Sequence, residues 1–500
     1  MASGTTSSVR NPNGAQTARD AGPTGDADPT RDADAAHTLH HRLARSVAAE
    51  SFVLLKNDDD VLPLAPKARV AFLGRFAESP RYQGAGSSHI APTHQDSLLE
   101  EARAVAPGAR IEYAPAYSLT GEGVDQALLQ EAVDTAAKAD VAVVFVGLPD
   151  AFESEGFDRD HMRLPESHVT LIQEVAAAQP HTVVVLSNGS PVEMDWEEQV
   201  GAVLESYLGG QAWGGAVADV LFGVSNPSGK LAETIPLRLE DVPSYLDFPG
   251  DTREVRYSEG VFVGYRYYDS RKMAVRYPFG HGLSYTDFSY SDGMLSDDGA
   301  HVSCLVTNDG DRPGAEVVQL YVHHRSPSVV RPEQELKGFE KVLLAPGATA
   351  TVKFPLTDRS FAYWDSSAAG WVVEAGEYEL RIGASSRDIR LTVTATRAAS
   401  PEIRQTFSRN SMLGDTFDHP DLGSAMQKLF QSFVTVFGDY QEGSPEERMF
   451  HSMVREIPLR DIVTFSQGRV LSREGLQVLI EALNGERPAA EAQKHLSASG

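Results

Sequence analysis

The chain has 500 residues, a formal net charge of −26 at pH 7 and 41% hydrophobic residues. Its length predicts roughly two to four domains, and its apolar content is enough to give each a core. The acidic balance disfavours nucleic acids and anionic membranes as partners, because both would repel the chain.

Several features that the sequence lacks indicate the cellular compartment of the protein. It has no apolar run of the roughly 18–20 residues that cross a bilayer, and its start shows no basic-then-apolar signal pattern. The single cysteine, Cys304, rules out an intramolecular disulfide and fits a reducing compartment. We therefore expect a cytoplasmic protein in which Cys304 is a buried thiol within the strand-like run HVSCLV.

Residues 1–37 are rich in Ala, Asp, Gly, Thr and Pro and have almost no large apolar side chain. Such a segment cannot bury enough surface to fold and is expected to be disordered. Residues 38–240 then alternate helix-like and strand-like patterns. The expected helices cover residues 41–51, 95–104, 123–137, 166–177 and 212–223, and the clearest strands cover 69–73, 110–113, 141–146 and 181–191. Continuous apolar strands between helices predict a mostly parallel sheet covered on both faces.

A cluster of charged side chains follows the strand-like run Val141–Val146, in which β-branched residues predict burial on both faces. The loop carries Glu153, Glu155, Asp158, Arg159 and Asp160. Acidic loops are usually solvated surface, and in so acidic a chain they are common by chance. In open α/β sheets, however, ligands bind at the carboxyl ends of strands, which makes this loop a candidate site.

A second loop, RFAESPRYQGAGSSHIAP, follows the strand expected at residues 69–73. Its Gly and Ser residues could cradle phosphates, but the Walker lysine and the GxGxxG pattern are both missing, which disfavours a nucleotide site.

Four phrases, VAAESFVLLKND, VVVLSNGSPVEMDW, GGQAWGGAVADVLFGVSNPSGKLAETIP and YPFGHGLSYT, resemble consecutive signatures of glycoside hydrolase family 3 β-glucosidases. The loop ESEGFDR with its later Leu-Pro step resembles the acid/base loop in the sandwich domain of that family. The resemblance implies that Glu155 is the general acid/base, with Glu153 as its local competitor. A general acid must hold a proton near neutral pH, which a partly buried site or a nearby carboxylate would favour by raising its pKa.

The resemblance also implies that the QGAGSS loop lies near the mouth of the active site. The substrate-binding candidates are therefore Gln83, Ser87 and Ser88 from that loop, together with Glu153, Asp158 and Arg159 from the acidic loop. We expect Asp158 and Arg159 to form an ion pair that holds the acidic loop.

The rest of the chain is expected to support the site. Residues 241–287 form a linker whose aromatic run, Tyr265 to Tyr268, either packs between domains or stacks on sugar rings. Residues 288–397 alternate apolar and polar side chains in short runs, which predicts a β-sandwich, and they resemble the immunoglobulin/fibronectin III-like domain of the family. Residues 398–500 have helical apolar spacing and form a helical C-terminal tail. We expect Met426, Met449 and Met453 on its core face and residues 489–500 to fray.

One part of the family's pattern has no match in the chain. Family 3 enzymes usually carry a (β/α)8 barrel of about 250 residues, which supplies the nucleophilic aspartate. No S-D-W-type nucleophile motif and no K-H-F-type substrate motif occurs. Retaining hydrolysis needs two carboxylates about 5–5.5 Å apart, and this chain offers a good candidate for only one of them.

Three hypotheses follow. The chain is the sandwich half of a retaining β-glucosidase-type hydrolase, acting on terminal non-reducing β-D-glycosidic bonds of oligosaccharides or aryl and alkyl glycosides, with the barrel on another polypeptide or lost. Alternatively, it is a non-catalytic sugar-binding or regulatory protein, or an assembly module whose helical tail forms a homodimer. The intact ESEGFDR loop favours the first, since a binding protein needs no general acid. No cofactor or metal is expected, because the histidines are scattered without ligand spacing.

Overall fold

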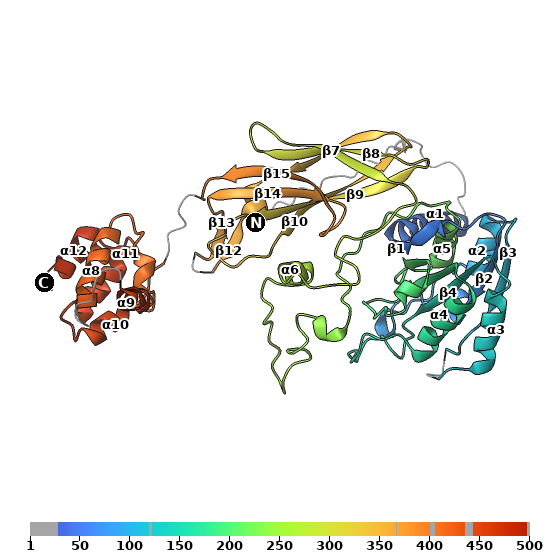
Figure 1. Cartoon of the computed structure of the whole chain (residues 1–500), viewed down its shortest axis with the longest axis horizontal. Helices are drawn as coiled ribbons and strands as arrows, with labels where there is room; N and C mark the ends of the chain where they lie inside the picture. The colour runs from blue at the N-terminus through green and yellow to red at the C-terminus, as the bar shows by residue number, and fades with distance from the viewer. Residues whose placement is uncertain (1–28, 120–122, 367, 401–405, 436–443, 498–500) are drawn as a thin grey trace. The chain divides into compact units, whose positions relative to one another are not determined.

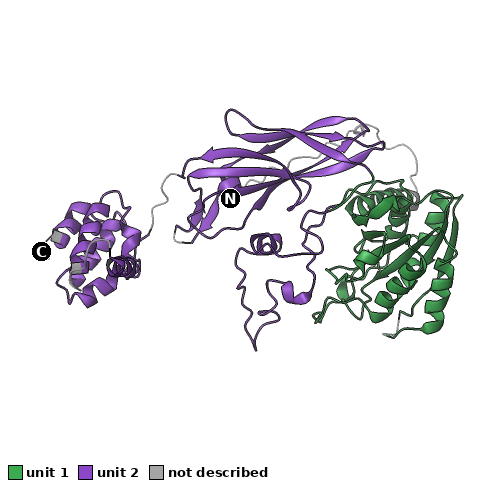
Figure 2. Ribbon diagram, in the orientation of Figure 1, with its two compact units in different colours: residues 1–229, 282–285 green, residues 230–281, 286–500 purple. Residues whose placement is uncertain are grey.

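The computed structural model describes residues 29–119, 123–366, 368–400, 406–435 and 444–497 (Figure 1). The chain divides into two compact units, residues 1–229 with 282–285 and residues 230–281 with 286–500 (Figure 2). The first unit is an α/β domain, and the second holds a β-sandwich and a group of helices. Among the described residues, no helix combines the length and the apolar character needed to cross a bilayer.

The first unit is built around a six-stranded sheet with the strand order β1-β6-β5-β4-β2-β3. Every neighbouring pair is parallel except β1 and β6. This confirms the mostly parallel sheet that the sequence predicts. The strands are β1 Val53–Asn57, β2 Arg69–Leu73, β3 Arg110–Ala114, β4 Val141–Gly147, β5 Thr182–Ser187 and β6 Ala202–Glu205.

Helices cover both faces of this sheet. Side chains alternate between the two faces along each strand, and apolar side chains on both faces are buried. On β2, Val70 and Phe72 belong to the core that also holds side chains of α1, α2 and α5. Ala71 and Leu73, equally buried, point to the opposite face, where α3 and α4 pack on each other and on the strands. The helices are α1 Pro29–Ser51, α2 Leu98–Val105, α3 Gln126–Ala136, α4 Glu166–Ala178 and α5 Trp213–Leu221.

The β-sandwich of the second unit consists of a four-stranded sheet, β10-β9-β14-β15, and a three-stranded sheet, β11-β8-β7. All of its strand pairs are antiparallel, and alternate side chains of both sheets fill one core that includes Cys304. The buried thiol expected from the sequence is confirmed. The strands are β7 Phe288–Leu295, β8 His301–Asn308, β9 Gly314–His324, β10 Glu335–Leu344, β11 Thr349–Pro355, β14 Gly376–Gly383 and β15 Ile389–Arg397.

Smaller elements complete this part of the unit. Strands β12 Tyr363–Asp365 and β13 Gly370–Val372 form a two-stranded ribbon, and the short helices are α6 Tyr265–Ser270 and α7 Asp358–Phe361. Tyr265 on α6 is buried, stacks on Phe279 with ring centroids 4.6 Å apart, and accepts a hydrogen bond from the Leu336 N–H at 2.7 Å. These contacts support packing, rather than sugar stacking, as the role of Tyr265.

The C-terminal helices have a core of their own, which among the described residues consists of side chains between Phe407 and Leu496. They are α8 Gly423–Thr435, α9 Pro445–Arg455, α10 Leu459–Phe465, α11 Arg473–Leu483 and α12 Ala489–Ser497. The expected helical segment is therefore confirmed, and it shares no core residue with the β-sandwich.

Three expectations about chain ends and faces are wrong. Helix α1 begins at Pro29, inside the segment expected to be disordered, while residues 1–28 lie outside the described residues. Residues 489–497 form α12, whose Ala492 is fully buried, instead of fraying. Met426 is buried as expected, but Met449 and Met453 are 60% and 59% exposed, because α9 packs through its other face.

Candidate active site

The acidic loop begins directly after Gly147, the last residue of β4. Strand β4 pairs in parallel with β2 on one side and with β5 on the other. The loops that follow β2, β4 and β5 therefore meet at one edge of the sheet, the edge where α/β domains bind ligands. Every site residue expected from the sequence lies in the loops after β2 and β4.

Glu155 projects from the β4 loop and is exposed, and the loop after β2 holds its carboxylate. Oε2 of Glu155 accepts a hydrogen bond from the backbone N–H of Ser87 at 2.7 Å. The hydroxyl and the N–H of Ser87 both favour the ionised carboxylate, so the pKa of Glu155 lies below its usual range. The raised pKa expected for a general acid is therefore not a property of this chain by itself.

Glu153 faces the loop after β5 instead. Its Oε2 accepts from the Gly189 N–H at 2.8 Å, and its Oε1 accepts from the Ser190 hydroxyl at 2.5 Å. Both oxygens are thus used in holding the loops together, which makes Glu153 a poorer candidate for proton transfer than the exposed Glu155. The sequence left both residues as candidates for the acid/base role, and these contacts favour Glu155.

Arg159 does not pair with Asp158, so the expected ion pair is wrong. The Arg159 side chain turns to the β5 loop, where Nη1 donates to the Ser190 hydroxyl at 2.7 Å and to the Pro191 carbonyl at 3.1 Å. Burial lowers the pKa of Arg159, while Glu153 and Glu193 act in the opposite direction. Asp158 is exposed and has no partner among the described residues. Arg159 therefore supports the loop and Asp158 does not.

The other two candidates of the β2 loop serve the loop itself. The Gln83 side chain donates to the Ile90 carbonyl at 3.3 Å and accepts from the Ile90 N–H at 3.1 Å. The Ser88 hydroxyl donates to the Ala85 carbonyl at 3.1 Å. Of the three residues from this loop, only Ser87 touches the acidic loop through a hydrogen bond.

A buried arginine that the sequence analysis did not identify fastens the acidic loop. Arg81 is 6% exposed, donates to the carbonyls of Leu148 and Glu153 at 3.1 and 2.9 Å, and also pairs with the Asp150 carboxylate. A charged residue in a loop is ordinarily read as solvated, so nothing in the local sequence marks Arg81 as buried.

Beneath the loop, the end of β4 rests on a neutral histidine. His168 on α4 is fully buried, its Nδ1 lies 3.0 Å from the Gly147 carbonyl, and its ring packs 4.1 Å from that of Tyr117. Burial lowers the pKa of His168 to about 3, against a smaller opposing effect of the backbone of Gly147. The imidazole therefore supports the end of β4 through its contacts with the backbone of Gly147 and is not a titrating catalytic group near neutral pH.

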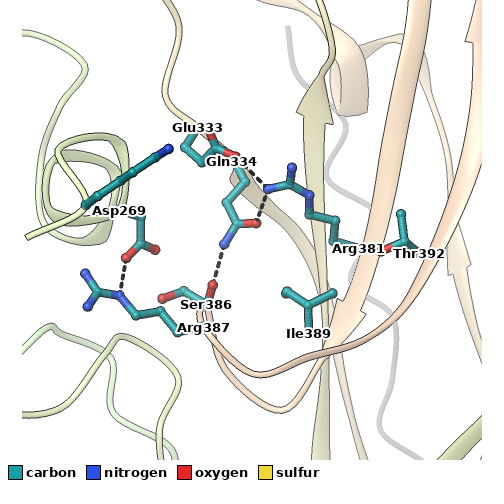
Figure 3. Close-up of a pocket in the computed structure, with 9 residues that line it drawn as sticks. Asp269, Glu333, Gln334, Arg381, Ser386, Arg387, Ile389 and Thr392 are labelled. Atoms are coloured by element: carbon teal, nitrogen blue, oxygen red, sulfur yellow. Dashed lines mark hydrogen bonds and ion pairs between the residues drawn. The ribbon is translucent and has the colours of Figure 1, made fainter.

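Glu155 does not line either of two cavities found among the described residues. One of about 490 Å³ borders the acidic loop and is lined by Phe152, His161, Val169, Glu193, Asp195 and Trp196, among others. Another of about 640 Å³ belongs to the second unit (Figure 3). There Arg387 pairs with Asp269 at 2.7 Å, and Arg381 donates to Glu333 and Gln334 at 2.9 and 3.0 Å. The two arginines and their carboxylate partners pair with each other, which favours a structural role for these four side chains, and Lys272 also lines the cavity.

Comparison with known proteins identifies the domains. Residues 52–285 match the model of the glycosyl hydrolase family 3 C-terminal domain, and residues 316–386 match that of the fibronectin type III-like domain. Thermostable β-glucosidase B of Acetivibrio thermocellus is 49% identical over 452 residues, 89% of this chain and 60% of that protein. An exo-α-(1→6)-L-arabinopyranosidase of Bifidobacterium breve is 48% identical over 368 residues, 71% of this chain and 48% of that protein.

A solved structure agrees with these relatives. The crystal structure of a family 3 β-glucosidase from Bifidobacterium adolescentis matches with a TM-score of 0.74 at 47% identity, covering 78% of this chain and 58% of that one. The chain thus spans 48 to 60% of the length of these three relatives. In the part of the chain that the structure describes, none of the sheets is an eight-stranded parallel barrel.

Proposed function

Because the chain contains the C-terminal domain of glycosyl hydrolase family 3, we propose that it supplies the acid/base half of a β-glucosidase-type active site. In this proposal Glu155 protonates the oxygen of the leaving group and later activates a water molecule. A second carboxylate, carried by a barrel domain outside the residues described, attacks the sugar, and the reaction proceeds with retention. The substrates are terminal, non-reducing β-D-glycosides.

The observation that carries this proposal is the placement of Glu155. It stands exposed at the carboxyl edge of the sheet, and the Ser87 N–H fixes its carboxylate from the neighbouring loop. An exposed carboxylate with a defined direction can reach a substrate that another domain presents. Glu153, in contrast, is occupied on both oxygens.

The low pKa of Glu155 is consistent with an active site that is still incomplete. Near neutral pH the isolated chain holds Glu155 ionised, which suits the base but not the acid. Bringing a second carboxylate and a sugar against it would remove water and add like charge, and both effects raise a carboxyl pKa. Proton donation in this proposal therefore depends on assembly of the complete site.

Helix α1 has a row of exposed apolar side chains on which another domain could pack. Leu39, Leu43 and Val47 follow one another at four-residue spacing and are 65%, 61% and 58% exposed. Residues at this spacing share one face of a helix, and exposed apolar faces of this kind commonly mark contacts with another domain or chain. In the proposal this stripe is available for the domain that brings the nucleophile.

The alternative is a sugar-binding or assembly protein without catalysis. The fact that the chain matches only part of its relatives is equally compatible with it, and the self-contained helical core favours an assembly role for the C-terminal helices. Neither hypothesis specifies which sugar is recognised, since the relatives include a β-glucosidase and an arabinopyranosidase.

Hydrolysis of p-nitrophenyl β-D-glucoside and of an alkyl β-D-glucoside tests the proposal. The chain would be assayed alone and after addition of a separately expressed family 3 barrel domain. We expect activity only in the mixture. Hydrolysis by the chain alone would place both carboxylates within it, and silence in both cases with calorimetric binding of glucose would favour the alternative.

Two variants assign the acid/base in the active mixture. Glu155→Gln should slow hydrolysis of the alkyl glucoside by about 10²–10⁴-fold. The nitrophenyl glucoside should be less affected, because its leaving group needs less protonation. Asp160→Asn is the matched control, since Asp160 lies on the same loop with 94% of its side chain exposed and is not one of the substrate-binding candidates. Equal rates for Glu155→Gln and the unaltered chain on the alkyl glucoside would remove Glu155 from the mechanism.

A further inference from the structure

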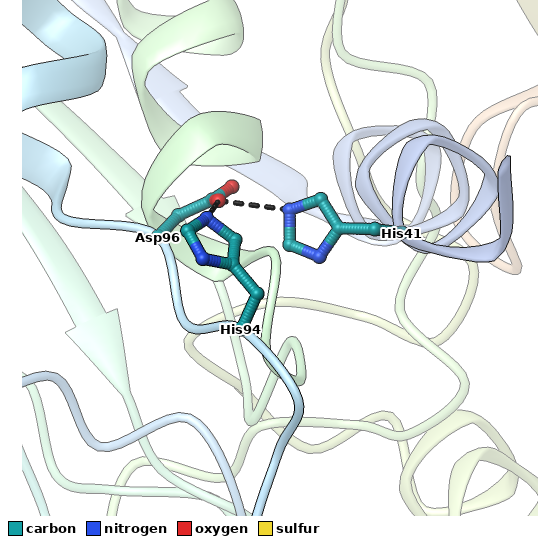
Figure 4. Close-up of side chains that lie close together, drawn as sticks. All are labelled: His41, His94 and Asp96. Atoms are coloured by element: carbon teal, nitrogen blue, oxygen red, sulfur yellow. Dashed lines mark hydrogen bonds and ion pairs between the residues drawn. The ribbon is translucent and has the colours of Figure 1, made fainter. Parts of the chain in front are cut away.

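Three side chains with metal-binding atoms, none of them an acid/base candidate, converge within the α/β domain. His41 reaches from α1, and His94 and Asp96 come from the segment just before α2 (Figure 4). Nε2 of His41 and Nε2 of His94 lie 2.8 and 3.2 Å from the same oxygen, Oδ1 of Asp96. One ligand atom of each residue lies within 4.8 Å of the others. The two segments are 55 positions apart between His41 and Asp96, which is why sequence spacing did not predict a metal site.

We propose that His41, His94 and Asp96 bind a divalent transition-metal ion, with Zn²⁺ as the best match. Two imidazole nitrogens and one carboxylate oxygen form the mixed N/O donor set that Zn²⁺ and its neighbours prefer, whereas Mg²⁺ and Ca²⁺ prefer all-oxygen sets. With metal–ligand bonds of about 2.0–2.1 Å, the donor atoms of a tetrahedral site lie about 3.3 Å apart. The two imidazole–carboxylate spacings, 2.8 and 3.2 Å, are close to this value, and the exposed His94 ring can move to set the spacing between the two imidazoles, which is at most 4.8 Å.

The neighbours of the three residues orient them for this role. Oδ2 of Asp96 accepts from the Gly215 N–H at 3.2 Å, which leaves Oδ1 directed at the two imidazoles. Nε2 of the Gln211 amide lies 2.9 Å from Nδ1 of His41. A 180° rotation of this amide would bring its oxygen to Nδ1, which would then carry the ring proton and leave the lone pair of the imidazole Nε2 for the metal, the arrangement typical of metal-bound histidine.

The surrounding charge also favours a cation. The guanidinium of Arg45 lies close to Asp96, since a Cβ on Gly215 would lie 2.6 Å from both of them. Arg45 is already paired with Asp219 and Glu101, each at 2.6 Å. Among these groups, three carboxylates therefore stand against one guanidinium. Asp96 is almost fully buried, with 2% of its side chain exposed, and a buried carboxylate gains from a bound cation.

The site differs in kind from the proposed acid/base site. His94 is 65% exposed, so a fourth position would be open to water or a small ligand. The bound ion would join α1 to the segment that also carries Ser87, the hydrogen-bond donor to Glu155. The expected role is therefore structural, as a link between the first helix and the loop after β2.

Zinc binding tests the proposal. The full-length, tag-free chain is first treated with a chelator and dialysed, and is then titrated with metal. Calorimetric titration with Zn²⁺ should show one site per chain, and Zn²⁺ but not Mg²⁺ should raise the unfolding temperature. His94→Ala should weaken binding by at least about tenfold, since it removes one of three protein ligands. Because His94 is exposed, this variant should fold normally, and His41→Ala provides a second, independent ligand deletion.

His89→Ala is the matched control. His89 lies on the same loop, is 49% exposed and faces a single carboxylate, Asp150, at 3.5 Å. Its loss should leave zinc affinity unchanged. The proposal is overturned if the chain shows no saturable zinc binding, which would make the cluster a histidine–aspartate hydrogen-bond network, or if His94→Ala and His41→Ala bind zinc as tightly as the control.

Discussion

A methyl group on Gly86 would lie 2.7 Å from Cβ of Glu155 and 2.9 Å from its Oε2. The backbone of the β2 loop thus approaches the proposed acid/base residue so closely that a side chain at position 86 would collide with it. Gly86 also has a φ of 74°, a conformation in which residues with a Cβ are strained. The glycine therefore allows the two loops of the candidate site to meet at Glu155.

Gly86→Ala should displace the carboxylate and lower activity of the reconstituted mixture by at least about tenfold, in line with small misplacements of catalytic groups. Gly210→Ala is the control, since Gly210 has a φ of 77° in the same domain but open space where a methyl group would lie. Both variants should lose about 1 kcal/mol of stability, measured by chemical unfolding. Equal activities of the two variants would contradict the role of the loop contact.

Arg81→Ala should destabilise the acidic loop. The buried guanidinium satisfies the carbonyls of Leu148 and Glu153, and unsatisfied buried acceptors cost about 1–3 kcal/mol each. We expect a loss of about 2–4 kcal/mol in the free energy of unfolding and faster proteolysis of the loop. Arg163→Ala, at an exposed position of the same loop, should change stability by less than about 0.5 kcal/mol. Similar effects of both variants would show that Arg81 does not fasten the loop.

His168 predicts a pH dependence of stability. Its pKa is about 3 in the folded chain because it is buried, and about 6.5 when unfolded. The unfolded state therefore binds more protons between these values, and the free energy of unfolding falls as the pH falls below about 6.5, by up to about 1.4 kcal/mol per unit. The fluorescence of Trp196 and Trp213, which are both buried in the α/β domain, reports the transition.

The His168→Asn variant isolates this contribution. It is expected to be less stable at pH 7, since part of the ring's packing is lost, but its stability should change less between pH 7 and pH 5. An identical slope in both proteins would mean that other groups account for the acid sensitivity.

A chain ending at Ser400 should keep the β-sandwich intact. Ser400 donates its N–H to the Val373 carbonyl and accepts from the Val373 N–H at 2.9 Å through its hydroxyl, so it belongs to the sandwich. The helices beyond it have a separate core. We expect the shortened chain to stay soluble with an unfolding midpoint within about 2 °C of the full chain, which corresponds to a few tenths of a kcal/mol.

Light scattering of the two chains then tests the assembly hypothesis. If only the full chain dimerises, the C-terminal helices are an association module. A shortened chain that aggregates would contradict the independence of the two cores.

The main features of the fold were predictable because they depend on local pattern. The run Val141–Val146 is continuously apolar and rich in β-branched residues, which is typical of a strand that is buried on both faces of a sheet. Together with Gly147 it forms β4. Helical spacing identified α8 to α11, but not every buried face. On α9 the pair Met449 and Met453 and the pair Phe450 and Val454 have the same spacing, and the second pair packs into the core.

The site was predictable as a loop but not as a set of contacts. The bond between Ser87 and Glu155 depends on β2 lying beside β4, and strand order cannot be read from the strands themselves. Arg159 has a long side chain with several possible partners, and its neighbour in the sequence, Asp158, proved to be the wrong choice. The cluster of His41, His94 and Asp96 was missed for the same reason, since it joins distant segments.

The hydrogen bond that the Ser87 N–H donates to Glu155 has a consequence for sequence variation. A main-chain donor does not depend on which side chain its residue carries, so substitutions at position 87 that keep the loop conformation keep this donor. Proline alone lacks the N–H. The direction of the proposed acid/base carboxylate can therefore persist while the side chains around it diverge, and a family of such chains could change substrate preference without moving this group.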